Sequence, residues 1–233
     1  MPNEKSRIFG GHVVSDLQRR WNPNPMFCHF GKRGGHLAAL RPHARNSYRA
    51  SIDLRSFFSN VTRSKVTRSL QSVGKTNKES YSIAEFSCVH HLGRKFLPFG
   101  FVQSMALATL ALENSALGST LRSIRASGVY VSVYVDDILL SHNCFATLEE
   151  VYARVVDAAI KSNFEVAADK CESPSPTLQS FNIKLDGVEM SVSAERLVQF
   201  EEAYRIGSEK TRKAILDYVT VVNTRQALGF ASL

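Results

Sequence analysis

The sequence predicts an α+β domain in which one sheet carries helices on one face, in the split βαβ arrangement. Three observations predict this class: an alternating strand over 48–54, a long Ala- and Leu-rich helical stretch over 101–125, and a β-branched hairpin over 129–141. Strands that enclose helices in this order suit an α+β sheet. A length of 233 residues is that of one domain with a sizeable core.

In the first quarter of the chain, the sequence predicts irregular structure followed by one strand. Residues 1–48 are rich in Gly, Pro, Asn and Arg, so we expect loops around short elements. The strand over 48–54 follows. Ser59 or Thr62 then caps a helix that runs to about Val73.

The middle of the chain predicts helices followed by a hairpin. We expect a helix over 81–89 and one long helix over 101–125, which Gly128 ends. Two apolar runs, 129–135 and 138–141, surround a two-residue polar turn. This pattern predicts a β-hairpin with two aspartates at its tip.

The last third predicts a helix, a second hairpin and further helices. Residues 147–162 have apolar positions at helical spacing. Residues 177–184 and 188–192 read as two strands turned at Asp186-Gly187. From Ala194 onward we expect mostly helix.

The charge of the chain favours a polyanionic partner. Lys and Arg total 29 against 21 Asp and Glu, which gives a net charge of +8 and a pI near 9.5. The stretch 19–68 holds eleven Lys and Arg residues and only one acidic residue, Asp53. Neutralising phosphates with such cations releases counterions, so nucleic acid is a candidate partner, although many basic proteins bind none.

The cysteines and the apolar segments indicate the cellular compartment of the protein. The four cysteines include no CxxC pair, which favours reduced thiols over a zinc site or a redox dithiol. The N-terminus lacks the apolar core of a secretory signal, and the most apolar stretch, 96–112, is interrupted by polar residues. We therefore expect a cytoplasmic protein with no membrane partner.

Three aspartates are the candidate chemical groups. Asp136 and Asp137 adjoin at the hairpin tip, where their like charges repel unless a cation is present. An ordinary Asp-rich turn is the alternative structural interpretation. Asp53 ends another apolar strand, and if that strand lies beside the hairpin, Asp53 and Asp136 converge and can bind two Mg²⁺ ions. Such a site in a basic chain indicates nucleotidyl transfer.

These residues resemble the motifs of reverse transcriptases. Tyr134-Val135-Asp136-Asp137 is similar to the YxDD box, residues 51–61 (SIDLRSFFSNV) to the first catalytic motif, and residues 97–104 (LPFGFVQS) to the LPxGxxxS box. Asp169-Lys170 resembles the fourth motif, and residues 181–184 (FNIK) resemble the primer-grip hairpin. The resemblance covers about residues 41–192, with the motifs in the order of the family.

The resemblance implies a polymerase palm with small flanking lobes. The palm would span 49–192, reduced fingers with a basic N-terminal region 1–48, and a short helical thumb 193–233. On this interpretation no RNase H, integrase or maturase region fits in the chain. A partner protein, a structured RNA or homo-oligomerisation could compensate for the weak grip of such small lobes.

The resemblance also implies roles for individual residues. Asp53 and Asp136 would be the ligands of two Mg²⁺ ions, with Mn²⁺ as a possible substitute, and Asp137 would support them as a third catalytic and metal-site residue. Phe58 would exclude a 2′-hydroxyl, unless it is a plain core residue. Lys170, Arg41 and Arg45 would reach the triphosphate, unless they are ordinary surface cations. The remaining candidates are Phe99, Gly100 and Gln103 for nucleotide binding and Phe181 and Ile183 for the primer grip.

Two departures narrow the group within the family. Phe99 stands where retroviral and retron enzymes frequently have glutamine, and Met105 stands where a proline usually follows the serine. Relaxed boxes of this kind are similar to those of bacterial reverse transcriptases of the abortive-infection and defence-associated groups.

The resulting hypothesis is an RNA-directed DNA polymerase in bacterial anti-phage defence. It would join deoxynucleotides (dNTPs) to a 3′-hydroxyl by a two-metal mechanism, copying an RNA template, possibly a structured noncoding RNA, into DNA. One alternative is untemplated or protein-primed synthesis by the same fold. Another is a noncatalytic RNA-binding palm subunit that assists a second polymerase.

Overall fold

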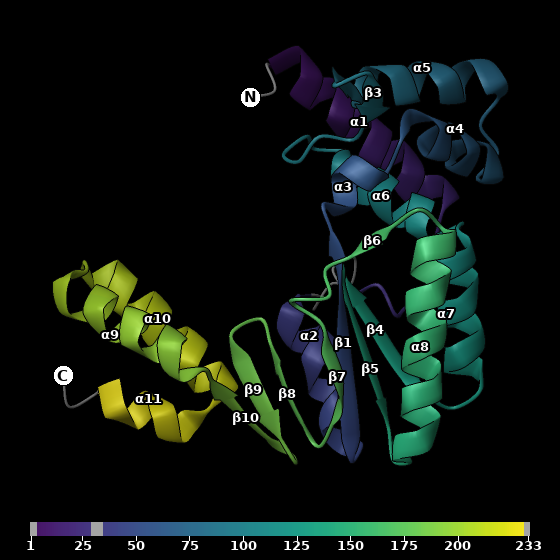
Figure 1. Ribbon diagram of the computed structural model, residues 1–233. Helices are drawn as coiled ribbons and strands as arrows, with labels where there is room; N and C mark the ends of the chain where they lie inside the picture. Colours follow the sequence, from purple (N-terminus) through teal and green to yellow (C-terminus); the bar gives the residue numbers. More distant parts are fainter. Residues whose placement is uncertain (1–3, 29–34, 231–233) are drawn as a thin grey trace.

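A five-stranded antiparallel sheet forms the centre of the protein in the computed structural model, which describes residues 4–28 and 35–230 (Figure 1). The strand order is β4-β5-β1-β6, and β7 also pairs with β1. β5 runs antiparallel to both of its neighbours, so β1 and β4 are parallel and are joined through helices, as a split βαβ unit requires. The strands are β1 (Tyr48–Arg55), β4 (Tyr130–Tyr134), β5 (Asp137–His142), β6 (Glu165–Val166) and β7 (Glu172–Ser175).

One face of this sheet is covered by two long helices, α7 (Ala116–Ala126) and α8 (Phe145–Lys161). Ile52 and Leu54 of β1 are buried in the same core cluster as the apolar residues of α8. Because successive side chains of a strand point to opposite faces, Asp53 projects from the other face. The alternation of β1 therefore separates hydrocarbon from carboxylate.

The opposite face is covered along the first half of β1, by two short helices and by Leu178, Ile183 and Leu185, which pack with Leu139 of β5. There the short helices α2 (His36–Leu40) and η2 (Arg41–Arg45) pack on β4 and β5. His43 is fully buried, and its ring nitrogens hydrogen-bond to Ser141 Oγ at 2.7 Å and Ser132 Oγ at 2.8 Å. The prediction of helices on one face is thus incomplete, because short helices occupy part of the second face.

A helical unit lies above the sheet and includes a helix where the sequence predicted loops. Residues 4–20 form one helix despite Gly10 and Gly11. A Cβ on Gly10 would lie 2.8 Å from Val102 Cβ, so the missing side chain allows close packing of two segments. The unit comprises α1 (Glu4–Arg20), α3 (Phe57–Asn60), α4 (Arg63–Ser72), α5 (Asn77–Ser87), α6 (Ser104–Glu113) and the hairpin of β2 (Val89–His91) and β3 (Arg94–Phe96).

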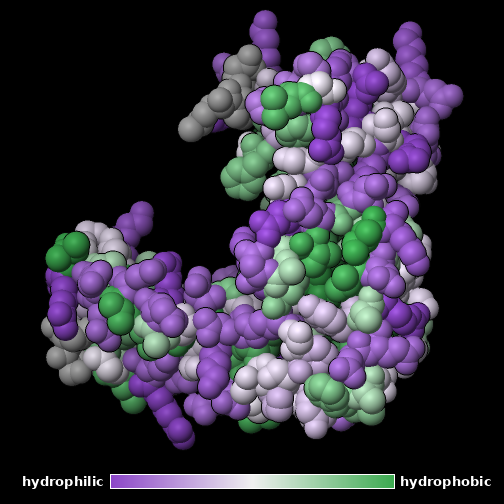
Figure 2. All heavy atoms as spheres, in the orientation of Figure 1, coloured by the Kyte–Doolittle hydropathy of each residue, from purple (hydrophilic) through white to green (hydrophobic). Residues whose placement is uncertain are grey.

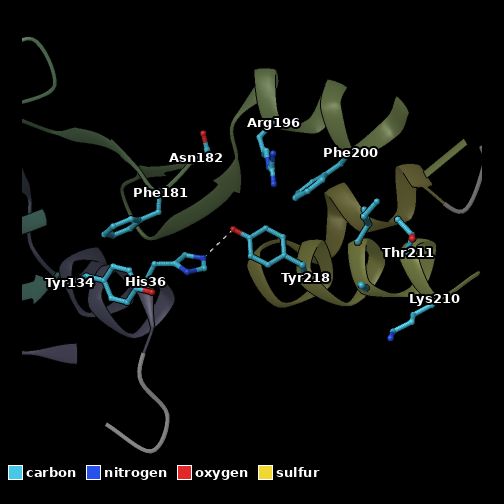
Figure 3. Close-up of a pocket in the computed structure, with 11 residues that line it drawn as sticks. His36, Tyr134, Phe181, Asn182, Arg196, Phe200, Lys210, Thr211 and Tyr218 are labelled. Carbon is cyan, nitrogen blue, oxygen red and sulfur yellow. Dashed lines mark hydrogen bonds between the residues drawn. The ribbon is translucent and has the colours of Figure 1, made fainter. Parts of the chain in front are cut away.

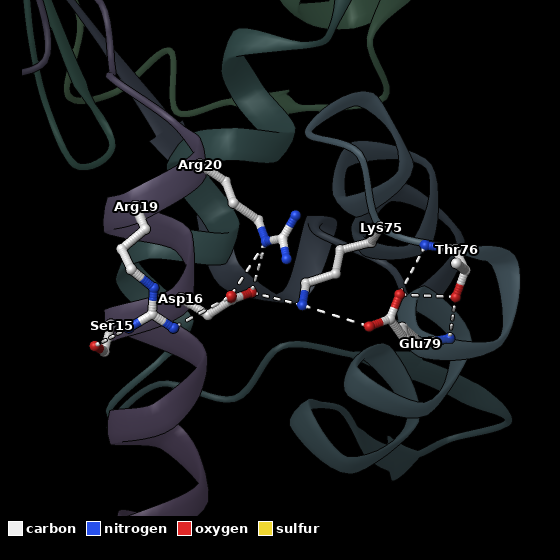
Figure 4. A network of polar contacts seen from close by, with 7 residues as sticks. All are labelled: Ser15, Asp16, Arg19, Arg20, Lys75, Thr76 and Glu79. Atoms are coloured by element: carbon white, nitrogen blue, oxygen red, sulfur yellow. Dashed lines mark hydrogen bonds and ion pairs between the residues drawn. The ribbon is translucent and has the colours of Figure 1, made fainter.

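Polar contacts attach α1 to the connection between α4 and α5 (Figure 4). Lys75 Nζ lies 2.6 Å from Asp16 Oδ2, and Arg20 Nε lies 3.1 Å from Asp16 Oδ1. The hydrogen bond from Lys75 is the main reason that the pKa of Asp16 is lowered. Thr76 and Glu79 form a capping box that starts α5. Residues 4–20 therefore belong with residues 57–113 in space, so the unit crosses the predicted boundary at residue 48.

The predicted helix over 101–125 is two helices, α6 and α7. Ser115 begins the second one, because its hydroxyl accepts a hydrogen bond from Gly118 N at 3.2 Å. A Cβ on Gly118 would collide with the Glu113 carbonyl oxygen, so the turn needs glycine. The helix predicted over 81–89 begins and ends earlier, at Asn77 and Ser87, since Val89 already belongs to β2.

The C-terminal part is a three-stranded sheet with three helices. The predicted turn at Asp186-Gly187 is present, but the strand predicted over 177–184 is broken at Phe181 and Asn182, which both have positive φ. Val192, Ile215 and Phe230 belong to a separate small core. The elements are β8 (Thr177–Ser180), β9 (Ile183–Asp186), β10 (Glu189–Val192), α9 (Ala194–Ile206), α10 (Glu209–Val222) and α11 (Thr224–Phe230).

The whole molecule is curved around the open part of the sheet. Figure 2 shows a concave side between the upper helical unit and the C-terminal helices. No helix among residues 4–28 and 35–230 has both the length and the apolar character needed to cross a bilayer. The cysteines at 28, 88, 144 and 171 are all free thiols, as the sequence predicted.

Candidate active site

Two of the predicted catalytic aspartates lie opposite each other on neighbouring strands. Asp53 of β1 and Asp137 of β5 are directly paired in the antiparallel register, and Leu54 N donates a hydrogen bond to the Asp136 carbonyl oxygen at 3.1 Å. Paired residues of an antiparallel ladder have Cα atoms about 4.5–5.5 Å apart. The expected neighbourhood of the two strands is therefore confirmed.

Asp136 occupies the tip of the β4–β5 hairpin. Val135, just before it, has φ of 62°, a left-handed conformation that is strained for a β-branched residue. This conformation ends the alternation of β4 at the tip. Asp136 lines a cleft of about 400 Å³ together with Val135, Phe58 and Phe99. Because Val135 and Asp136 form the turn, the Asp136 carboxylate lies in the cleft and Asp136 is not paired in the β4–β5 ladder.

The three carboxylates lie close enough that their negative charges repel one another and raise pKa values. Burial and the charges of Asp136 and Asp53 raise the pKa of Asp137 to about 7. Burial, and secondarily the charge of Asp53, raises the pKa of Asp136 as well. The positive charge of Lys170 acts in the opposite direction on both pKa values, which places Lys170 near the pair as predicted.

Crowded carboxylate oxygens suit a hard divalent cation. Oxygen ligands are those that Mg²⁺ prefers, and a bound cation would remove the repulsion that raises these pKa values. Within the described ranges, no three His, Cys, Asp or Glu side chains already stand in a ligand arrangement. The metal-binding roles of Asp53, Asp136 and Asp137 therefore stay predictions, which the chemistry of the donor set fits.

Aromatic and aliphatic side chains form the rest of the cleft wall. The rings of Phe58 and Phe99 lie 5.8 Å apart at 64°, and Phe99 is 85% exposed. Met105 lines the same cleft. Both positions that depart from the family pattern thus lie beside Phe58 and Asp136. Phe58 is half-buried: it packs against the main core and also lines the cleft, so both interpretations of this residue stay open.

The loop that carries Phe99 is held in a turn. Gly100 has φ of 92°, where glycine is favoured, and Ser104 Oγ donates to the Pro98 carbonyl at 2.7 Å. The prediction for Gln103 is wrong in this structure. Its side chain is 1% exposed and donates to Ser87 Oγ at 3.2 Å beneath Gly10 of α1, so it cannot contact a nucleotide.

Arg41 and Arg45 belong to η2, which precedes β1. Arg41 Nη2 donates to the Val221 carbonyl of α10 at 2.7 Å, so its guanidinium contacts the C-terminal helices. The predicted contact of both arginines with a triphosphate stays a prediction.

The two predicted primer-grip residues have different surroundings. Phe181 packs edge-on against Tyr134 of the YxDD box, with ring centroids 5.4 Å apart. It lines a pocket of about 700 Å³ between the β8–β9 turn and α10 (Figure 3). Ile183 is instead 0% exposed and packs with Leu139 in the core that joins the two sheets. Ile183 is therefore a structural residue, which corrects its predicted role.

Sequence reasoning missed several residues around this site. His36 and Tyr218 hydrogen-bond across the Figure 3 pocket, where His36 Nε2 lies 3.2 Å from the Tyr218 hydroxyl oxygen. The Cys171 thiol accepts a hydrogen bond from Asp53 N at 3.4 Å. Arg49 is buried and donates to the carbonyls of His43, Ala44, Pro176 and Gly187. A charged residue in the first half of a largely buried strand was the only signal for Arg49, and no local signal indicated the others.

Comparison with known proteins identifies the family. The model of the family described as "Reverse transcriptase (RNA-dependent DNA polymerase)" matches residues 8–200. The chain belongs to this family. A retron Ec86 reverse transcriptase from Escherichia coli is 27% identical to it over 141 residues, which cover 60% of this chain and 42% of that relative. The chain thus spans less than half of the length of this curated reverse transcriptase.

Solved structures of the family and of telomerase share the fold. A telomerase from Candida albicans aligns with a TM-score of 0.55 at 9% identity, covering 98% of this chain and 47% of that one. A foamy viral protease-reverse transcriptase, solved in complex with an RNA/DNA hybrid, aligns with a TM-score of 0.52 at 15% identity, covering 100% of this chain and 34% of that one. These TM-scores show a shared fold, and the mixed α/β architecture is consistent with a polymerase palm.

Proposed function

We propose that the protein is an RNA-directed DNA polymerase that adds deoxynucleotides to a 3′-hydroxyl with two divalent metal ions. The observation that carries the proposal is the pairing of Asp53 with Asp137 on the open face of the sheet, with Asp136 in the adjoining cleft. Membership of the reverse transcriptase family supports the reaction type.

In this proposal Asp53 and Asp136 hold two Mg²⁺ ions, and Asp137 supports them. Divalent ions at such a site lower the pKa of an attacking hydroxyl and stabilise the charge on the leaving pyrophosphate. Asp137 keeps a proton more readily than an ordinary carboxyl group, because burial and its neighbours raise its pKa to about 7. Lys170, whose charge reaches the pair, would neutralise phosphate oxygens as the new bond forms and pyrophosphate departs.

Phe58 is the proposed sugar selector. Its ring lines the cleft beside Asp136, and Phe99 stacks edge-on against it. A 2′-hydroxyl placed against this apolar wall would lose water without gaining a hydrogen bond. The site would therefore take deoxynucleotides.

The other parts of the molecule are proposed to hold the nucleic acid. The sheet with α7 and α8 would act as the palm, and α9–α11 as a short thumb. The fingers would comprise α1 together with 57–113, which revises the expectation that they end at residue 48. Phe181 and Tyr134, at the mouth of the Figure 3 pocket, would contact the primer end. A partner protein or a second copy of the chain would extend this grip.

The decisive experiment is primer extension by purified protein. Wild-type protein with an RNA template, a DNA primer, dNTPs and Mg²⁺ should yield extended DNA, and Asp136→Asn should remove about 10³-fold of the rate. Asp157→Asn is the matched control, because Asp157 is an exposed aspartate of α8 on the other side of the sheet. Undiminished extension by Asp136→Asn would refute the active-site assignment.

Two alternatives give different outcomes in the same assay. Protein-primed synthesis would leave the DNA attached to the chain, so protease digestion would change its migration on a gel. A noncatalytic RNA-binding subunit would bind RNA but extend no primer under any metal. Phe58→Ala adds a third readout: incorporation of ribonucleotides should rise about tenfold if the ring selects the sugar.

The biological setting is proposed as bacterial anti-phage defence in the cytoplasm, with a structured noncoding RNA as template. The retron relative from Escherichia coli and the relaxed Phe99–Met105 box support this setting. Cells carrying the gene with its neighbours should reduce phage plating, and the Asp136→Asn allele should restore it. Equal plating on both strains would contradict the defence role while leaving the enzymatic proposal intact.

A further inference from the structure

A basic hollow lies on the helical side of the molecule, outside the candidate active site. It has a volume of about 460 Å³ and lies where α4, the α6–α7 junction and the end of α8 meet. Three cations line it, Lys65, Arg68 and Lys161, and no Asp or Glu is among the described residues of its wall. Hydroxyl and amide groups complete the wall, including those of Ser72 and Asn114.

The positive charge of this hollow is not balanced locally. Burial, followed by the charges of Arg68 and Arg94, lowers the pKa of Lys65 to about 8. Lys65 is also fixed in place, because its ammonium group donates to the carbonyls of Asn60 at 2.8 Å and Asn163 at 3.0 Å. A fixed, partly desolvated cation among other cations favours an anionic ligand.

A second hollow adjoins the first, and the two share Ser72 and Asn114 in their walls. It measures about 540 Å³ and adds Arg122 and Trp21. Its one carboxylate, Glu113, already accepts hydrogen bonds from Trp21 Nε1 at 2.8 Å and Asn24 N at 3.2 Å. We call the two hollows together the helical-side groove.

The groove and the catalytic carboxylates lie on opposite sides of the sheet. α7 and α8, which form part of the groove, cover the face on which Ile52 and Leu54 are buried, whereas Asp53 projects from the other face. In Figure 1 these helices lie on the side away from α9–α11. A ligand in the groove is therefore separate from the primer and template in the cleft.

We propose that the helical-side groove binds the phosphate backbone of RNA outside the catalytic cleft. Phosphate contacts in nucleic-acid complexes come from Arg and Lys together with Ser and Asn side chains, the groups found here. Cations at both ends of two joined hollows fit a chain of phosphates better than one phosphate ion. The Trp21 indole lines the second hollow, and aromatic rings are the groups on which bases stack. The choice of RNA as the ligand rests on the proposed function, whereas the preference of the groove for phosphate groups rests on its own side chains.

The test compares two double variants that remove equal charge. Arg68→Gln with Lys161→Gln changes exposed groove residues while leaving the anchored Lys65 intact. Lys5→Gln with Arg154→Gln is the control, because both are exposed cations, of α1 and α8, that line neither hollow and lie outside α9–α11. The probe is a labelled mixed-sequence RNA of about 30 nucleotides, long enough to cover several phosphate contacts.

Two readouts are expected to separate the variants. The groove variant should bind the RNA about tenfold more weakly at moderate salt, and the slope of log K against log salt should fall by about 1.4 for two lost phosphate contacts. Trp21 is the single tryptophan of the sequence and lines the groove, so its fluorescence reports occupancy directly. RNA should change this emission in the wild type and the control, and much less in the groove variant.

Three results would overturn the proposal. Equal weakening in both variants would mean that only net charge matters. Displacement of the RNA signal by millimolar inorganic phosphate would indicate a single-phosphate site, and an equal Trp21 response to polyglutamate would indicate an acidic protein partner. Extension of a short primer–template should stay unchanged in the groove variant, whereas Asp136→Asn should lose extension and keep the Trp21 response. Failure of the groove and failure of the polymerase are thus distinguishable.

Discussion

The two faces of the central sheet differ in what the same strand contributes to each. Ile52 and Leu54 of β1 bury their side chains under α8, whereas Asp53, between them, projects to the side that α2 and η2 leave uncovered. The helical face supplies stability through apolar burial. The open face gives up part of that stability by crowding Asp53 with Asp136 and Asp137. Adjacent positions of one strand therefore serve folding and chemistry separately.

Of the tests that compare the two faces, the largest expected effect is the loss of activity in Asp53→Asn. The variant removes one metal ligand, so the primer-extension rate should fall about 10³-fold. Its free energy of unfolding without metal should stay equal or rise, because the substitution removes repulsion with Asp137. Urea unfolding and primer extension on the same preparation measure both quantities. A variant that is inactive only because it unfolds would break the proposed separation.

The converse substitution is Ile52→Ala on the helical face. Removing a fully buried side chain should lower the free energy of unfolding by about 2–5 kcal/mol. At a temperature where the variant stays folded, the metal affinity should change little, since the carboxylates project from the opposite face. Urea unfolding and Mg²⁺ titration check the two parts. A loss of metal affinity as large as that in Asp53→Asn would show that the faces are not separable.

The covered end of the open face should show a pH dependence of stability. Burial, with a smaller effect of the Arg49 charge, lowers the pKa of His43 to about 3, against an ordinary value near 6.5. The unfolded chain therefore binds one more proton between these values. The contribution of neutral His43 is complete above about pH 6.5 and is lost as the pH falls toward 3, by up to about 1.4 kcal/mol per pH unit.

Unfolding measured from about pH 7 to pH 4.5 tests this dependence. The matched variant is His43→Asn, which can still hydrogen-bond to a serine hydroxyl but cannot take up the proton. Its stability should be lower than that of the wild type at neutral pH and should fall less steeply with acid. Parallel curves for the two proteins would rule out His43 as the titrating group.

The smallest expected effect is a stabilisation by Mg²⁺. A cation that binds the folded site with millimolar affinity should raise the free energy of unfolding by about 1.4 kcal/mol at ten times its Kd. Thermal unfolding with and without Mg²⁺ measures the shift. Asp53→Asn should abolish the shift and Asp157→Asn should keep it. A shift retained by Asp53→Asn would place the cation elsewhere.

Local sequence patterns predicted the parts of the fold that depend on near neighbours. The alternation of β1 and the turn at Asp186-Gly187 are present as predicted. The hairpin over 129–141 is present too, but its turn is Val135-Asp136 and Asp137 already begins β5. The interruption at Ser115 was missed, because an Ala- and Leu-rich stretch hides a short capping signal. The helix α1 was missed as well, because Gly10 and Gly11 are typical helix breakers, and the packing of Gly10 against Val102 and Gln103 is not visible in the local sequence.

The residues predicted for the candidate site also fall into two groups, those that lie at the cleft and those that do not. Phe58, Phe99 and Lys170 lie beside Asp136 as the motifs indicated, whereas Gln103 and Ile183 do not contribute to the cleft. A motif predicts that a residue is near the site, but burial and direction depend on which element packs over it. Gln103 shows this dependence most directly, because α1, nearly a hundred residues earlier in the chain, covers it.

By itself the sequence determined the order of the strands along the chain, the membership of the family and the pairing of acidic residues with strand ends, since these follow from local periodicity and short motifs. Only the tertiary structure decided which face carries the carboxylates, which predicted residues are buried, and that Lys65, Arg68 and Lys161 share one groove. The reason is physical: periodicity is a property of neighbouring residues, whereas desolvation and the convergence of charges arise from segments distant in sequence.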